Sequence, residues 1–194
     1  MPEASTPETI GNLNRIAILQ LLKREGALSR AEIARRLNLS FPAVSANMKI
    51  LLDNNFIVTS GETDSNNNTL GRPSVLLSFN AKRGYVVGVC SDIKYIRAVC
   101  ADLLGNVIAG TKLKYDFAKG GEEMYKLMCS AIDEVVGKSG LLPEDLEYIA
   151  IGIPGVFDEK LGKYRLVPFV ENWEDIGIKE RIQEKMGTRV VMDN

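Results

Sequence analysis

Four polar residues between positions 40 and 49 have types and a spacing that could do chemistry as a group: Ser40, Ser45, Asn47 and Lys49. Serine hydroxyls and an asparagine amide donate and accept hydrogen bonds, whereas a lysine ammonium group only donates. The set suits the base edges of the major groove of DNA, with the lysine meeting a phosphate. It acts as a unit only where one element holds the side chains on a common face.

A helix over residues 41–52 is the element that we expect to hold them. Apolar residues recur at helical spacing and predict its buried stripe: Val44, Met48, Leu51 and Leu52. Ser45, Asn47 and Lys49 then lie on the opposite, outward face. Ser40 caps the helix, and Pro42 is tolerated in the first turn because the N–H that it lacks would be unpaired there.

A shorter helix comes before it. Ser29 and Glu32 have the separation of a capping box, which pairs orphan backbone donors at a helix start. The inward residues of this helix are Ile33, Ala34 and Leu37, and Asn38-Leu39 makes the turn. The pair predicts a helix-turn-helix with its second helix in the major groove of DNA. An ordinary helical hairpin is the alternative, but the agreement of caps, turn and flanking strands favours DNA binding.

The flanking segments predict a winged helix-turn-helix domain over residues 12–80. A helix over 12–25, with Ile16, Leu19 and Leu22 inward, precedes the pair, and residues 1–11 form a flexible arm. Strands over 56–59 and 74–79 follow it and make a two-stranded hairpin. The polar segment between them is the wing, whose tip ends in Gly71-Arg72-Pro73.

Beyond a junction at residues 80–84 the pattern predicts an α/β domain over 84–194. The expected strands are 85–90, 95–101, 107–115, 148–153 and 189–192, with a small hairpin over 156–165 and helices over 121–137 and 176–186. The apolar run 148–153 is typical of a buried strand. Leu104-Gly105-Asn106 predicts a tight turn.

The charge distribution and the amino-acid composition favour a nucleic-acid-binding protein and exclude several kinds of catalytic and metal site. Residues 11–83 carry ten Lys and Arg against five Asp and Glu, whereas 84–194 carry fourteen against eighteen, although the whole chain has a net charge of −1. A basic module joined to an acidic remainder suggests a nucleic-acid partner. The absence of histidine excludes nucleophile–histidine pairs and histidine-containing zinc sites. Three cysteines in apolar contexts indicate reduced thiols in a cytoplasmic protein, without a secretion signal or membrane span.

Several segments together resemble the ROK family, which contains the xylose and N-acetylglucosamine repressors. They are LNLSFPAVSANMKILLDNNFIV, the Gly-Arg-Pro of the wing, GVCSDIKYIRAVCADLLGNVI, IAIGIPGVFD and VVMDN. The resemblance implies a winged helix-turn-helix followed by the first lobe of an actin-like, ribonuclease H-like sugar-kinase fold. It places six residues at the groove-facing start of the recognition helix: Ser40, Phe41, Pro42, Ala43, Ser45 and Asn47. Lys49 then meets a phosphate, and Arg72 enters the minor groove unless it is a solvated loop charge.

This sequence also differs from the family's sugar kinases at the positions that bind ATP. Where those enzymes have an aspartate and two glycines for ATP phosphates, this chain has Cys90, Asp92 and Ile93. Side chains there block the backbone approach of a phosphate loop, so kinase activity is disfavoured. Asp92 is either a metal-binding acid or a turn cap, and we favour the cap.

The sugar site implied by the resemblance is incomplete. Gly155, Asn172 and Asn194 match its positions, although Asn172 lies beside Trp173, which alternatively anchors a loop. The family's acidic sugar contact would follow Asn194, and its zinc cluster is missing. We expect a fragment of a longer protein rather than a regulator that lost its inducer cleft.

We expect a sequence-specific transcriptional regulator, a repressor of carbohydrate genes. The partners that the resemblance implies are double-stranded operator DNA, a sugar or sugar-phosphate inducer and a second copy of the chain, with no metal or cofactor. The alternatives are a ROK-type sugar kinase with an added N-terminal module, and a winged helix used for protein contacts.

Overall fold

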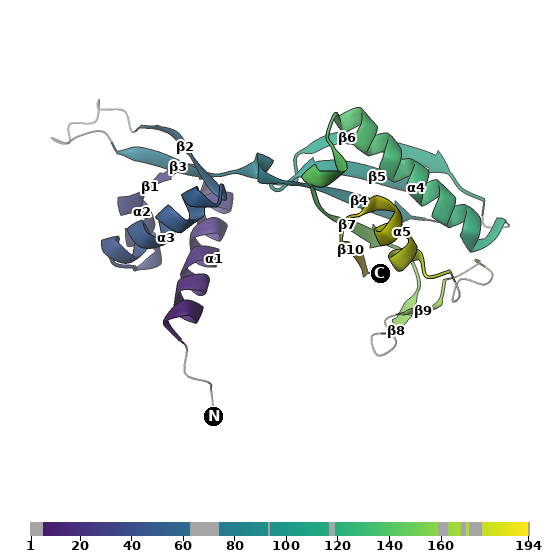
Figure 1. Ribbon diagram of the computed structural model, residues 1–194, viewed down its shortest axis with the longest axis horizontal. Coiled ribbons are helices and arrows are strands. Elements are labelled where there is room, and N and C mark those ends of the chain that lie inside the picture. Colours follow the sequence, from purple (N-terminus) through teal and green to yellow (C-terminus); the bar gives the residue numbers. More distant parts are fainter. Residues whose placement is uncertain are drawn as a thin grey trace. The chain divides into compact units, whose positions relative to one another are not determined.

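The computed structural model (Figure 1) describes residues 6–62, 74–92, 94–116, 119–158, 163–167, 170 and 176–193. The chain divides into two compact units, Met1–Arg83 and Gly84–Asn194. Each unit has its own cluster of buried apolar side chains. None of the described helices is both long and apolar enough to cross a membrane.

Unit 1 is a three-helix domain with a small sheet. Its elements are α1 (Pro7–Glu25), β1 (Leu28–Ser29), α2 (Arg30–Leu37), α3 (Phe41–Asp53), β2 (Ile57–Glu62), β3 (Val75–Phe79) and the 3-10 turn η1 (Ala81–Arg83). The sheet has the order β1-β3-β2, and both pairings are antiparallel. The helices lie together beside this sheet (Figure 1), which is the winged helix-turn-helix arrangement predicted from the sequence.

Two features of unit 1 differ from the prediction. Helix α1 begins at Pro7, so the flexible arm expected over residues 1–11 was wrong for residues 7–11. The side chain of Thr6 accepts a hydrogen bond from the Thr9 N–H at 3.2 Å, and proline suits the first helical position. The expected two-stranded hairpin has a third strand, β1, which pairs Leu28 with Leu77. Two residues are too few to show a period.

The core of unit 1 lies between the three helices and β3. Its fully or nearly fully buried members are Ile18, Leu21, Leu22, Leu28, Ile33, Val44, Met48, Leu51, Ile57 and Leu77. The stripe predicted for α3 is confirmed at Val44, Met48 and Leu51. The inward position predicted for Ile16 was wrong, because its side chain is 52% exposed.

The segment after β3 is anchored to the end of α3. The backbone N–H of Asn80 donates to the Phe56 carbonyl at 3.0 Å. Its side-chain amide donates to the Asn55 carbonyl at 2.9 Å. Arg83 donates through Nε to the Asn54 carbonyl at 3.2 Å, and its guanidinium lies 4.1 Å from the centroid of the Phe56 ring. Residues 80–83 are therefore held as part of unit 1.

Unit 2 is built on a five-stranded mixed sheet. Its elements are β4 (Tyr85–Ser91), β5 (Tyr95–Asp102), β6 (Val107–Lys114), α4 (Gly120–Ser139), the 3-10 turn η3 (Pro143–Asp145), β7 (Leu146–Gly152), β8 (Val156–Asp158), β9 (Lys163–Leu166), α5 (Ile178–Met186) and β10 (Val190–Asp193). The order is β10-β7-β4-β5-β6. Strands β4, β5 and β6 form an antiparallel meander, and β7 runs parallel to β4 and β10. This topology confirms the predicted ribonuclease H-like first lobe.

One face of this sheet carries the core. Helices α4 and α5 lie on the same side of it (Figure 1). Ile149 and Ile151 of β7 are buried on that side, but Tyr148, which points to the other face, is 40% exposed. The buried strand predicted over residues 148–153 is therefore confirmed on this side of the sheet, whereas the other face is partly exposed. Of the three free thiols, Cys100 and Cys129 are buried and Cys90 is exposed.

Candidate nucleic-acid interface

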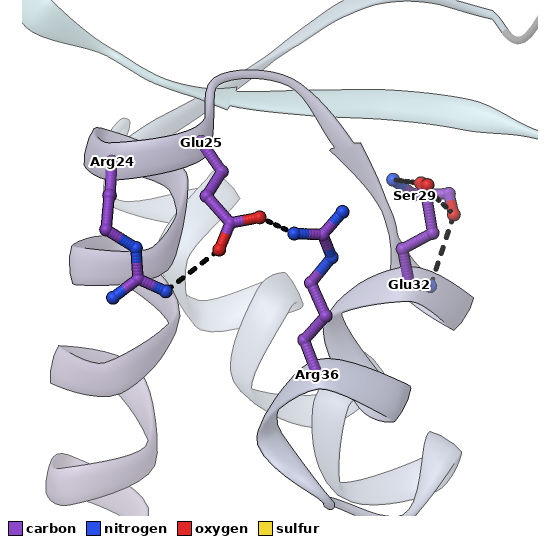
Figure 2. A network of polar contacts seen from close by, with 5 residues as sticks. All are labelled: Arg24, Glu25, Ser29, Glu32 and Arg36. Atoms are coloured by element: carbon purple, nitrogen blue, oxygen red, sulfur yellow. Dashed lines mark hydrogen bonds and ion pairs between the residues drawn. The ribbon is translucent and has the colours of Figure 1, made fainter.

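The predicted helix-turn-helix is formed by α2, a short turn and α3. The backbone N–H and hydroxyl of Ser29 donate to Oε2 of Glu32 at 2.9 and 2.8 Å, and the Glu32 N–H donates back to the Ser29 hydroxyl at 3.3 Å (Figure 2). These hydrogen bonds hold the pKa of Glu32 below its usual value. The capping box is thus confirmed. Helix α2 ends at Leu37, and its C-cap Asn38, with a positive φ of 52°, makes the turn.

Helix α3 presents a mostly small and apolar outward surface at its start. The hydroxyl of Ser40 accepts from the Ala43 N–H at 3.3 Å and caps the helix, as predicted. Phe41 is 55% exposed, Pro42 and Lys49 are exposed, and Ser45 is half-buried. Two further outward residues were not predicted: Ala46 is exposed and Ile50 is 44% exposed. The sequence could have indicated both residues, because Ala46 lies four positions after Pro42 and Ile50 lies four positions after Ala46, which puts the three on one face of the helix.

The outward position predicted for Asn47 was wrong. Its side chain is only 7% exposed, and its amide donates to the Ala43 carbonyl at 2.8 Å. Its Oδ1 accepts a hydrogen bond from Nη1 of Arg15 in α1 at 3.2 Å. Asn47 lies three residues after Val44 and four before Leu51, which places it on the buried stripe. The residue therefore joins α3 to α1.

Basic residues surround the helix pair, but not all of them are free to meet phosphate. Glu25 forms ion pairs with Arg36 and, at 2.8 Å, with Arg24 (Figure 2). The side chain of Glu25 is only 24% exposed, so it partly neutralises Arg36 at the end of α2. Lys49 forms no ion pair with any described residue and is exposed. Lys49 is therefore the cation on α3 that is available to an anion.

The remaining predicted site residues are not part of helix α3. Arg72, Asn172 and Asn194 lie outside the described residues. Gly155 is half-buried between β7 and β8 of unit 2. The predicted contacts of all four residues remain predictions.

The segment after β4 has the geometry of a capped turn. Oδ1 of Asp92 accepts from the backbone N–H groups of Lys94 and Tyr95 at 2.7 and 2.8 Å, and its other oxygen accepts from Arg97. These partners lower the pKa of Asp92 to about 2. Its carboxylate is thus committed to the turn, which is the cap interpretation of this residue.

Comparison with known proteins agrees with this architecture. A family model described as winged helix-turn-helix DNA-binding matches residues 12–58. A crystal structure of a ROK family transcriptional regulator, a homologue of the Escherichia coli MLC protein, matches with a TM-score of 0.68 and 21% identity. The match covers 95% of this chain and 46% of that chain. The chain has the fold of a ROK family transcriptional regulator. The resemblance predicted from the sequence is confirmed.

Curated relatives agree as well. The xylose repressor of Caldicellulosiruptor bescii is 25% identical over 182 residues, which are 94% of this chain and 45% of the repressor. The xylose repressor of Bacillus spizizenii is 28% identical over 186 residues, which are 95% of this chain and 47% of the repressor. The chain therefore spans about half the length of the curated relatives that it matches.

Proposed function

We propose that this protein is a sequence-specific DNA-binding transcriptional regulator that uses α3 as its recognition helix. The observation that carries the proposal is the outward surface of α3 within a winged helix-turn-helix. This surface combines apolar groups, a hydroxyl and a cation that forms no ion pair with a described residue, and each has a partner in a DNA groove. Ser45 bonds base edges, Phe41, Pro42 and Ala43 contact thymine methyl groups, and Lys49 meets a phosphate. Arg72 enters the minor groove beside the wing.

Asn47 has a positioning role in this proposal. The hydrogen bond that it accepts from Arg15 joins α3 to α1, and the one that it donates to the Ala43 carbonyl holds its side chain along α3. Ser40 acts mainly as the cap that starts the helix, because its hydroxyl accepts from the Ala43 N–H. Base selection is thereby concentrated at Ser45 and the apolar residues around it.

The relatives named as xylose repressors support a wider proposal for the whole protein. It represses carbohydrate genes in the cytoplasm as a homodimer on operator DNA, and a sugar or sugar phosphate shifts its geometry. Gly155, Asn172 and Asn194 belong to the sugar site in this proposal.

Selection of bound sequences from a random duplex library tests the DNA-binding role. The chain should enrich a defined motif, and Ser45→Arg should lose this selectivity while non-specific binding stays equal or rises. Lys49→Gln should weaken binding to all sequences and reduce the slope of log K against log salt by about 1. Lys179→Gln, an exposed lysine on α5, is the matched control. Enrichment of the same motif by Ser45→Arg would contradict the assignment of α3.

We further propose that the protein is not a sugar kinase. Asp92 is engaged by backbone N–H groups and Arg97, in the segment where a kinase holds phosphate with glycines. A coupled assay of ATP turnover with a panel of sugars tests this statement. Sugar-dependent ADP release above the background without protein would overturn it.

A further inference from the structure

Cationic side chains gather at one corner of the sheet of unit 2. Lys94 lies in the turn before β5, Arg97 lies on β5, and β6, an edge strand of the sheet (Figure 1), carries Lys112 and Lys114. We call these four residues the basic corner. Its three lysines are exposed, and the side chain of Arg97 is 41% exposed.

The strand register places the basic corner on the face of the sheet that α4 and α5 do not cover. Arg97 pairs with Lys112 across the two strands. Tyr95 pairs with Lys114, so these four side chains point to the same face. Ile96, between Tyr95 and Arg97, is fully buried in the core of unit 2. The corner therefore faces solvent.

The ring of Tyr95 lies among these cations. The ammonium nitrogen of Lys112 is 3.8 Å from the ring centroid, and the guanidinium carbon of Arg97 is 5.5 Å from it. A shallow hollow of about 370 Å³ beside the ring is lined by Asp92, Lys94, Tyr95 and Arg97. An aromatic face attracts cations without neutralising them. The ring thus helps to gather positive charge at this corner.

The charges at the corner do not cancel. The carboxylates next to it in the sequence are Asp92, which pairs with Arg97, and Asp116. The three lysines of the corner form no ion pair with any described residue. Residues 84–194 carry fourteen Lys and Arg against eighteen Asp and Glu. Four cations beside two carboxylates are therefore a concentration of positive charge on an acidic unit.

We propose that the basic corner binds backbone phosphates of the same DNA duplex that α3 reads. Exposed lysines suit a repeating array of phosphates, because each ammonium is a point charge that needs no fixed geometry. A small phosphorylated ligand fits less well, since the hollow is open and its lining includes the carboxylate of Asp92. The inference rests on the proposed DNA-binding function and adds to it a contact that carries no sequence information.

Protection of a sheet edge is the other role that such lysines can have. It accounts for Lys112 and Lys114 on β6, but not for Lys94, which precedes β5, or for Arg97, which lies on an inner strand. Contact with DNA accounts for all four.

The chain between the two units is short. Gly84 alone separates η1 of unit 1 from β4 of unit 2. DNA that is held by α3 is therefore present at a high local concentration for unit 2, and a few weak phosphate contacts then add to the affinity.

Binding of the full chain to a duplex that carries the selected motif, extended on both sides by unrelated sequence, tests the contact. Lys112→Gln combined with Lys114→Gln should select the same motif and weaken binding to every sequence at least several-fold. The slope of log K against log salt should fall by about 2. Lys126→Gln combined with Lys179→Gln is the matched control, because both lysines are exposed on helices of unit 2. The control should keep the slope of the natural protein.

Cys90 reports whether DNA covers the corner. It is the exposed thiol, whereas Cys100 and Cys129 are buried, and it pairs with Arg97 in the register of β4 and β5. The duplex should slow alkylation of Cys90 by a maleimide at least several-fold. This protection should be reduced in the variant that lacks both lysines of β6.

The outcomes separate this proposal from the function on which it rests. If the variant without Lys112 and Lys114 binds with the affinity and slope of the control, and DNA leaves the alkylation of Cys90 unchanged, the proposal is overturned. Self-association of that variant would then assign the two lysines to edge protection. If Ser45→Arg keeps the motif while the lysine variant loses affinity, the assignment of α3 fails and the contact of the basic corner stands. Absence of DNA binding by the natural chain would refute both.

Discussion

Replacement of Asn47 by alanine separates a structural role for this residue from a base-reading one. The change removes the hydrogen bond from the Asn47 amide to the Ala43 carbonyl and the one that Oδ1 accepts from Arg15. Both partners lie in unit 1, and the Asn47 side chain is 7% exposed. We therefore expect a loss of stability in α1 and α3, together with weaker binding to every DNA sequence.

The magnitude follows from the two contacts. A neutral hydrogen bond contributes about 1 kcal/mol and one to a charged group about 1.5–3 kcal/mol. Water can replace Asn47 as the partner of Arg15, and alanine is favoured over asparagine in a helix by roughly 0.7 kcal/mol. The net loss in the free energy of unfolding is therefore about 1.5 kcal/mol. For a domain of this size it lowers the midpoint temperature by roughly 6–12 °C.

Hydrogen exchange of backbone amides in the intact chain measures this loss where it occurs. Amides of α3 that exchange through opening of unit 1 should exchange about tenfold faster in Asn47→Ala, whereas those of α4 should be unchanged. Ser45→Ala, two residues earlier and half-exposed, is the control and should change stability by less than about 0.5 kcal/mol. A double-mutant cycle with Arg15→Ala should give a coupling of about 1 kcal/mol.

A structural role for Asn47 would be refuted by unchanged stability together with altered base selection. If Asn47→Ala keeps the exchange rates of the natural protein but changes the selected base at one operator position, Asn47 reads DNA and the contact with Arg15 carries no stability.

Substitutions at three further sites test individual contacts. Ser29→Ala should lower the free energy of unfolding by about 1 kcal/mol. Because the capping box lowers the pKa of Glu32, the stability that the Glu32 carboxylate contributes is present above the ordinary carboxyl pKa and is lost as pH falls through the lower folded value. Urea midpoints measured between pH 7 and 3 should therefore show less acid dependence in Glu32→Gln. Asp102→Ala should lower the free energy of unfolding in urea by about 2 kcal/mol. The Asp102 carboxylate accepts hydrogen bonds from the backbone N–H groups of Leu104 and Asn106 and from the Asn106 side-chain amide at 2.8–3.0 Å. An unchanged urea midpoint would show that the turn at Gly105 needs no anchor. Glu122→Gln should leave the urea midpoint nearly unchanged, because the ion pair of Glu122 with Arg181 is half-exposed. Arg181→Ala should lower the urea midpoint, since the Arg181 guanidinium also lies 3.8 Å from the centroid of the Tyr125 ring. Equal effects of the two substitutions would contradict a role for the ring.

Local patterns were enough to predict most of the elements. The stripe of Val44, Met48 and Leu51 located α3, and Gly105 marked the turn between β5 and β6, where its φ is +85°. The capping box of Ser29 and Glu32 was also readable, because both partners lie within one helical turn. Short-range chemistry of this kind does not depend on the rest of the fold.

Long-range pairing explains most of what was missed. Strand β1 exists because Leu28 pairs with Leu77, nearly fifty positions later, and two residues alone carry no period. The helical spacing placed Asn47 on the buried stripe, but its polar partner there, Arg15, lies in another helix and could not be read from the local sequence. Ile16 was placed inside because it is apolar, although the core begins only at Ile18.

The anchoring of residues 80–83 gives unit 1 a defined point of mechanical load. Asn80 and Arg83 are tied to the carbonyl groups of Asn54, Asn55 and Phe56, directly behind the last turn of α3. We therefore expect a pull on the chain at Gly84 to act on the end of α3 through these hydrogen bonds.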